Sequence, residues 1–455
     1  MPAQPPLSFI APAFNPLVLR GTQALLPLWL RLNTEIRQVQ ATGLESLAEL
    51  YHQFQTQKIR LLLAFRHPSV NDPLCLAYLI WHLLPQAAKD TKSPLKPPIH
   101  SHFLYDRGIP LWAGAWVGWL NARLGGVPIQ RGKLDLTGLR TARDLLVNGQ
   151  FPLAIAPEGA TNGHNQLLSP LEPGIAQLSF WCLEDLHKAG RNETVFLVPI
   201  GIQYRYLTPP WDAVEQLLTQ LEHNSGLSNT SENGDHTPEQ LYHRLYALGE
   251  HLLTLMENFY REFYHQSLPP QLPADPSDPN RLLAERLHRL LDAALQVAEQ
   301  YFALKPKGNF SDRCRRIEQA GWDCIYREDH KPTANLSPAE RGLANLVAEE
   351  ANLRLWHMRI VETFVATTGH YVKDRPTAER FAETSLLLWD LVARIQGSNP
   401  FHRPQLGPQQ VTLTVAEPIA ISPRWQAYQT NRRQAVATLT QDLQQALTNT
   451  IATDP

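Results

Sequence analysis

A histidine and an aspartate five residues apart, His67 and Asp72, are the side chains in this sequence best suited to acid–base chemistry. Of the 17 histidines, only His67 has an aspartate five positions later. A carboxylate that reaches an imidazole fixes its tautomer and stabilises its protonated form, which makes the imidazole a general base for a hydroxyl or a thiol. The simpler interpretation, that His67 ends a strand and Asp72 only caps a helix, remains open at this point.

The pair lies between a predicted strand and a predicted helix. Residues Ile59–Phe65 are mostly apolar and have the length of a buried strand. Residues Leu74–Leu84 have the pattern of a helix, which Asn71 or Asp72 can cap. We therefore expect His67 in a turn at the end of the strand and Asp72 in or near the first helical turn. A step of five residues through such a turn can bring the carboxylate back to the imidazole.

Between residue 100 and about residue 206, short apolar runs alternate with helical patterns. The expected strands are His100–Tyr105, Val127–Gln130, Leu153–Ala156 and Val195–Gln203, and the expected helices are Leu111–Leu124, Thr137–Asn148 and Gly174–Lys188. This alternation predicts an α/β fold with a mostly parallel central sheet flanked by helices. Ligands gather at the carboxyl ends of the strands in such sheets. His67, Arg131 and Glu158 each come shortly after a predicted strand, which favours a site at that edge.

Helical patterns dominate residues 211–400, and strand character then returns. The expected helices are Val214–Glu222, Pro238–Tyr264, Arg281–Phe302, Pro338–Thr368 and Thr377–Ile395. An alternating segment follows at Gln409–Ile421, with a last helix over Arg424–Thr448. We expect an N-terminal amphipathic segment (1–40), an α/β domain (41–210), a large α-helical insertion (211–400), and a final strand and helix that complete the α/β domain (401–455).

The composition excludes several classes of protein. The 41 basic and 43 acidic residues of this 455-residue chain nearly balance, which argues against a general nucleic-acid binder. The four cysteines are scattered and lack the spacing of a zinc site, so a reduced, intracellular protein is the simplest interpretation. No run of about 18 apolar residues predicts a membrane-spanning helix, and the N-terminus lacks the order of a signal peptide.

Two apolar stretches could contact lipid. Leu17–Leu32 is rich in leucine and holds only Arg20 and Arg31 as charges, so it could lie in a bilayer interface with the arginines reaching the headgroups. A helix docked on its own domain would have the same pattern. Leu111–Leu120 contains three tryptophans and could line an acyl-chain pocket, rest on lipid or belong to the core.

Four segments in order resemble the glycerolipid acyltransferase family, which includes the lysophosphatidate and glycerol-3-phosphate acyltransferases. The segments are His67…Asp72, the glycine-led strand Gly126…Arg131, Pro157-Glu158-Gly159 and Val198-Pro199-Ile200. Ala416-Glu417-Pro418-Ile419 is similar to the closing strand of the family. The resemblance covers roughly residues 40–206 and 409–450. The proline at position 199 also predicts an edge strand or a bulge.

The resemblance implies a mechanism and a set of partners. His67 would deprotonate a glycerol hydroxyl while Asp72 orients the imidazole, and the alkoxide would attack a fatty-acyl thioester directly. Arg131 would hold the phosphate of the acceptor, most simply 1-acylglycerol-3-phosphate, and the acceptor site would include Glu158 and Gly159. The thioester of acyl carrier protein or of coenzyme A would be the donor, without another cofactor or a metal. Family members act at the membrane surface, which implies a cytoplasmic protein associated peripherally with the membrane.

The sequence departs from the family after the Pro-Glu-Gly block. The family usually has Thr-Arg-Ser there, and this chain has Ala160-Thr161-Asn162, so an arginine that binds phosphate is missing and Thr161 stands in the acceptor site. Lys133 or Arg66 could replace that arginine. Alternatively, the acceptor is another lysophospholipid or a molecule without phosphate.

A function of another class is also open for the helical region. The pairs Glu262 with His265 and Glu285 with His288 have the spacing of ligands in helical metal–carboxylate bundles. The helical region could also be a scaffold beside a catalytically silent domain. The intact His67 and Asp72 argue against a silent domain.

Overall fold

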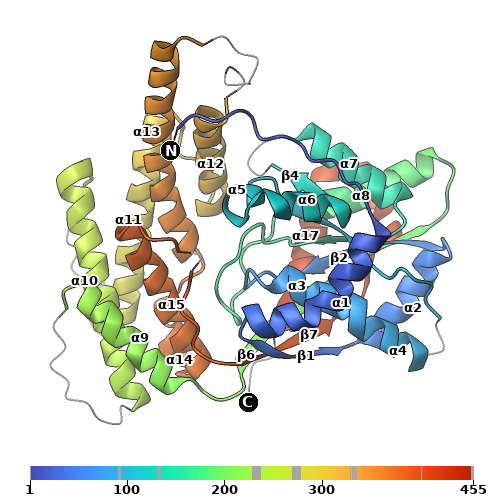
Figure 1. Cartoon of the computed structure of the whole chain (residues 1–455), viewed down its shortest axis with the longest axis horizontal. Coiled ribbons are helices and arrows are strands. Elements are labelled where there is room, and N and C mark those ends of the chain that lie inside the picture. Colours follow the sequence, from blue (N-terminus) through green and yellow to red (C-terminus); the bar gives the residue numbers. More distant parts are fainter. Residues whose placement is uncertain are drawn as a thin grey trace. The chain divides into compact units, whose positions relative to one another are not determined.

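The computed structural model describes residues 2–90, 94–130, 135–227, 237–268, 278–327, 329, 336–400 and 402–451. The chain folds into two compact units. The α/β unit comprises Ser8–Leu207 and Pro408–Pro455, and the helical unit comprises Met1–Leu7 and Thr208–Gly407. The helical unit therefore interrupts the α/β unit in the sequence, and the predicted α/β fold with a helical insertion is confirmed (Figure 1).

Within the described residues, eight strands form one sheet in the α/β unit. The strands are β1 (Ile36–Thr42), β2 (Ile59–Phe65), β3 (His102–Asp106), β4 (Gly126–Ile129), β5 (Leu153–Ile155), β6 (Thr194–Tyr206), β7 (Gln409–Val415) and β8 (Ile419–Ala420). Their order is β1-β7-β6-β2-β5-β3-β4, and β8 pairs with β6 beside β7. Only the pairs of β6 with β7 and β8 are antiparallel, so the predicted mostly parallel sheet is confirmed.

Helices cover both faces of this sheet (Figure 1). One face packs against α1 (Pro16–Asn33), α2 (Leu44–Gln55), α3 (Asp72–Tyr78), the π-helix Leu79–Leu83 and α4 (Leu84–Asp90). The other packs against α7 (Leu136–Asn148), α8 (Gly174–Lys188), α16 (Trp425–Thr430) and α17 (Arg432–Asn449). Strand β2 is apolar on both sides because both faces of the sheet are covered. Leu61 and Leu63 pack in the core beneath α1–α4, and Leu62 and Ala64 pack in the core beneath α7, α8 and α17.

Several predicted boundaries were wrong, each for a local reason. The helix expected over Leu111–Leu124 divides into α5 (Ile109–Ala113) and α6 (Ala115–Arg123), because Gly114 adopts a φ of 98°. Strand β1 and helix α2 were not predicted. Most β1 side chains are exposed or half-buried, so its sequence lacks a strong apolar pattern. The last helix begins with the 3₁₀ turn Ser422–Arg424 and is interrupted between α16 and α17.

The expectation that Pro199 marks an edge strand was wrong. Strand β6 lies inside the sheet, and Pro199 pairs with Ala64 of β2. On its other side, β6 pairs with β7 from Ile200 onward and with β8 at Phe196 and Leu197. Pro199 therefore lies between the segment of β6 that pairs with β8 and the segment that pairs with β7. Its missing N–H removes no hydrogen bond of either pairing.

The helical unit contains α9 (Trp211–Asn224), α10 (Pro238–Tyr264), α11 (Pro279–Tyr301), α12 (Phe310–Ile325), α13 (Pro338–Phe364), α14 (Tyr371–Asp374) and α15 (Ala378–Ile395). Helix α12 was not predicted, because it is rich in charged residues, two of which, Arg313 and Glu318, are buried. Arg313 of α12 pairs with Glu299, and Glu318 pairs with Arg359. Among the described helices of both units, none is long and apolar enough to cross a membrane.

Candidate active site

The predicted pair meets in the turn between β2 and α3. The imidazole Nδ1 of His67 lies 3.0 Å from Oδ2 of Asp72, which also accepts the backbone N–H of Ser69 at 2.7 Å. Asp72 is fully buried at the first position of α3, whereas the His67 side chain is 20% exposed. Asn71 precedes the helix but makes no side-chain cap bond. The Asp72 carboxylate thus holds both the turn and the imidazole.

A tyrosine that the sequence did not single out completes the support of Asp72. The hydroxyl of Tyr204, on β6, donates to Oδ1 of Asp72 and lies 3.5 Å from Sγ of Cys75. Burial and the neighbouring carboxylate raise the pKa of Tyr204 well above its ordinary value, so the hydroxyl keeps its proton and donates it. Tyr204 is 132 residues from Asp72, and only the pairing of β6 with β2 brings them together.

The same surroundings exclude Cys75 as a nucleophile. Its side chain is fully buried, and burial with the nearby Asp72 raises the pKa of the thiol above its ordinary value. A nucleophilic cysteine requires an accessible thiolate. Cys75 therefore contributes packing beside the pair.

The outer nitrogen of the imidazole is free to act on a ligand. With Nδ1–H donated to Asp72, Nε2 carries the lone pair of the neutral ring. No residue in the described part of the chain forms a hydrogen bond with His67 Nε2, and the ring is partly exposed. This arrangement suits a general base whose tautomer is set by a buried carboxylate.

Glu158 supports the backbone of His67. It follows β5, and its Oε1 accepts the His67 N–H at 2.7 Å. Its Oε2 accepts from Nδ2 of Asn162 and from the N–H of Ser169, both at 3.0 Å. The residue is 4% exposed, and burial raises the pKa of its carboxyl, while the charge of Arg66 and the backbone N–H groups of His67 and Ser169 oppose the rise. Glu158 thus fixes the strand end that carries His67 to the loop after β5.

Arg66 is also part of this support, and the expectation that it could bind phosphate was wrong. Its side chain is fully buried. The guanidinium donates to three carbonyls of the loop after β5, those of Asn165 (2.6 Å), Leu167 (2.7 Å) and His164 (3.3 Å). A guanidinium held in this way stabilises the loop and has no surface for an acceptor.

The other predicted acceptor residues lie at the same edge or outside the described residues. Gly159 has a φ of 72°, a left-handed conformation that favours glycine, and its N–H donates to the carbonyl of Ala156 at 3.3 Å. Thr161 is exposed in the same turn. Arg131 and Lys133 follow β4 but lie outside the described residues. Contact of these four residues with an acceptor stays a prediction.

The metal ligands expected as an alternative are not brought together. His265 ends α10 with a φ of 51°, so it leaves the helical face that Glu262 occupies. The ring of His288 packs against Phe310, with 4.6 Å between ring centroids. No group of three or more metal-binding side chains forms in the part of the chain that the structure describes.

Comparison with known proteins connects this site to one family. Residues 38–203 match the family model described as Acyltransferase. The matched span contains His67, Asp72 and Glu158 and ends one residue before Tyr204. No curated protein matches the chain.

Proposed function

Because residues 38–203 match the Acyltransferase family model, we propose that the chain is a glycerolipid acyltransferase, which moves a fatty-acyl group from a thioester donor to a hydroxyl of a glycerolipid. The domain is that of an O-acyltransferase, and we favour 1-acylglycerol-3-phosphate as the acceptor. The observation that carries the proposal is the free Nε2 of His67, with Nδ1 held by the buried Asp72. The reaction needs acyl carrier protein or coenzyme A as the carrier of the acyl group and no further cofactor.

The proposed reaction proceeds without a covalent acyl-enzyme. His67 Nε2 takes the proton of the acceptor hydroxyl as its oxygen attacks the thioester carbonyl carbon. The tetrahedral intermediate expels the thiolate, which receives the proton from the imidazolium. Asp72 stabilises the imidazolium during these steps, and general-base catalysis of this kind contributes about 10²–10⁴ in rate. The buried, protonated Cys75 is consistent with direct transfer.

The acceptor has a second candidate. The family arginine is replaced by Thr161, and Arg66 is buried among loop carbonyls, so neither supplies a second cation for a phosphate. This favours another lysophospholipid or a molecule without phosphate as the alternative acceptor.

An assay with both donors and several acceptors tests the proposal. Purified protein is incubated with acyl carrier protein or coenzyme A thioesters of one fatty acid, each with 1-acylglycerol-3-phosphate, lysophosphatidylcholine and monoacylglycerol. We expect ester formation fastest with 1-acylglycerol-3-phosphate. Faster acylation of either other acceptor supports the alternative acceptor. Absence of transfer with every combination contradicts the proposed function and favours a silent domain beside a helical scaffold.

We also propose that the protein, in the cytoplasm, binds the membrane surface peripherally through α1. Three leucines of α1, Leu19, Leu26 and Leu30, are buried. The helix also exposes large apolar side chains, which are Leu17, Leu25, Leu28, Trp29 and Leu32. Arg20 and Arg31 are exposed on the same helix and could reach headgroups.

Helix α1 packs against α3, which carries Asp72, and against α6, which exposes Trp116 and Trp119. Exposed apolar surface of this extent is typical of an interaction site.

Removing two exposed leucines of α1 should weaken membrane binding. In Leu28→Ser/Leu32→Ser, side chains that are 55% and 70% exposed lose their apolar character. Each leucine contributes about 1.5–3 kcal/mol when fully buried, so we expect binding to phospholipid vesicles to fall by about tenfold or more. Co-sedimentation measures the bound fraction. The control is Leu343→Ser/Leu346→Ser on α13, where the side chains are 66% and 56% exposed. Equal losses in the two double variants contradict a role for α1.

A further inference from the structure

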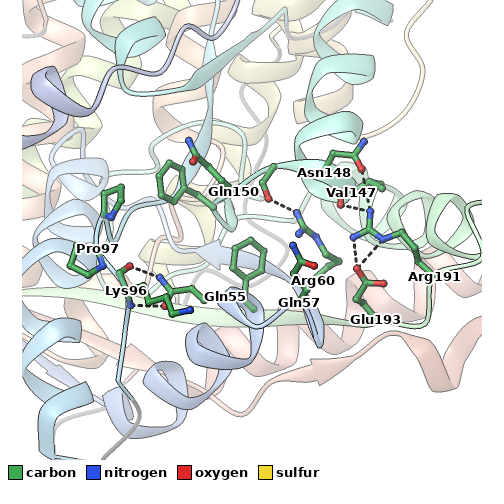
Figure 2. Close-up of a pocket in the computed structure, with 14 residues that line it drawn as sticks. Gln55, Gln57, Arg60, Lys96, Pro97, Val147, Asn148, Gln150, Arg191 and Glu193 are labelled. Carbon is green, nitrogen blue, oxygen red and sulfur yellow. Dashed lines mark hydrogen bonds and ion pairs between the residues drawn. The ribbon is translucent and has the colours of Figure 1, made fainter.

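A polar cavity lies at the end of the sheet opposite His67. Figure 2 shows the residues that line it. Its volume is about 620 Å³, within the range of small-molecule sites. The walls come from the end of α2, the start of β2, the end of α7 and the segments that lead into β5 and β6. These three strands are parallel, so their amino ends share this edge. Since β2 has seven residues, its length of roughly 20 Å separates the cavity from the histidine turn.

Arg60, the second residue of β2, supplies a buried positive charge to this cavity. It is 4% exposed. The N–H groups of its Nε and Nη2 donate to carbonyls at the end of α7, those of Leu146 (2.6 Å), Gly149 (2.8 Å) and Leu145 (3.3 Å). These bonds explain why an arginine is placed beside the carboxyl end of a helix. They use Nε and Nη2 and leave both hydrogens of Nη1.

The Nη1 group of Arg60 has no hydrogen-bond partner in the described residues, and none of their carboxylates forms an ion pair with it. Nη1 is also not enclosed by protein. Burial lowers the pKa of Arg60 to about 10. This agrees with a guanidinium whose positive charge is only partly balanced by the groups around it. An anion in the cavity would accept the two remaining N–H groups and complete that compensation.

The neighbouring side chains have the same preference for an anion. Lys96 lines the cavity, and within the described residues its amino group has no partner, because only its backbone bonds to Gln55. Arg191 adds a third cation, and Glu193, the one carboxylate among the lining residues, binds it (Figure 2). Within the described residues, Arg60 and Lys96 therefore form no ion pair with the acid of the cavity, although the charge of Glu193 also acts on Arg60.

We propose that this cavity binds the phosphate group of a small molecule, through Nη1 of Arg60 and the amino group of Lys96. Phosphate offers several oxygens to donors that approach from different directions, which suits a guanidinium and an ammonium on separate segments. The site is separate from the acyl-transfer site, and the proposal does not depend on the proposed function.

Calorimetric titration of the full chain with inorganic phosphate at constant ionic strength tests the site. We expect saturable binding that is about tenfold weaker in Lys96→Gln, because a charge-assisted hydrogen bond is lost. Lys89→Gln is the matched control, since Lys89 is an exposed lysine of the same unit outside the cavity. Absence of saturable binding, or equal loss in Lys96→Gln and Lys89→Gln, overturns the proposal.

Two further measurements identify the source and the place of the phosphate. Arg131→Gln should leave the phosphate affinity that depends on Lys96 unchanged, because the sequence places Arg131 two residues after β4, whose carboxyl end lies at the edge of the sheet away from the cavity. Loss in Arg131→Gln without loss in Lys96→Gln places phosphate in the acceptor site and contradicts the proposal. Displacement of bound phosphate by phosphatidic acid vesicles would support recognition of a lipid headgroup, and displacement only by soluble phosphate esters would support a free metabolite.

Discussion

Replacement of His67 by alanine is expected to lower kcat for acyl transfer by about 10²–10⁴-fold, the contribution of a positioned general base. The change removes Nε2, the ring atom that is free to take a proton from the acceptor hydroxyl. It leaves the backbone N–H that donates to Glu158, so the strand end stays in place. Initial rates with saturating donor and acceptor measure the effect, and thermal unfolding checks that the variant is folded.

A histidine on the surface of the same unit provides the control. His187 of α8 is exposed and packs against Trp425, so His187→Ala should keep the wild-type rate. A His67→Ala protein that remains folded and retains wild-type activity would show that another group accepts the proton. If both variants lose activity to the same extent, the loss reflects a general disturbance of the domain.

The elements that carry the site could be predicted because their residues are consecutive in the sequence. The run Ile59–Phe65 is buried on both faces of a parallel sheet, which leaves an uninterrupted apolar pattern. The short spacing of His67 and Asp72 lets one turn bring them together, so the pattern of two residues was sufficient. The return of the last strand to the sheet could also be predicted, because Val411, Leu413 and Val415 alternate along it.

The groups that support the pair could not be predicted, because they depend on contacts distant in sequence. Tyr204 reaches Asp72 only because β6 pairs beside β2 and continues beyond its end. Arg66 has the composition of a phosphate ligand, but the loop after β5 folds over it and presents three carbonyls. The local sequence around an arginine at a strand end does not distinguish an arginine that binds phosphate from one that supports a loop. The presence of Pro157, Glu158 and Gly159 predicted a turn, but not that the carboxylate would hold the backbone of His67.

Replacement of Asp72 by asparagine is expected to lower kcat on the order of 10²-fold, with little change in KM. Asparagine keeps the shape of the side chain but lacks the negative charge that stabilises the imidazolium. If its Nδ2 faces His67, the imidazole must present a lone pair at Nδ1 and loses the one at Nε2. If Nδ2 faces Tyr204 instead, the tautomer is kept and only the charge is lost. Either orientation leaves a weaker base, so steady-state kinetics should report a loss in kcat.

The Tyr204→Phe variant removes a hydrogen bond that supports Asp72 but keeps the negative charge of its carboxylate. The phenylalanine removes the hydroxyl that donates to Oδ1, while the carboxylate and its contacts with His67 and Ser69 remain. Loss of one hydrogen bond to a buried carboxylate costs about 1–3 kcal/mol, which should appear mainly as lower thermal stability. We expect kcat to fall by about tenfold or less, clearly less than in Asp72→Asn. If Tyr204→Phe loses as much activity as Asp72→Asn, the position of the carboxylate, which Tyr204 helps to fix, matters more than its charge, because that charge is present in Tyr204→Phe and absent in Asp72→Asn.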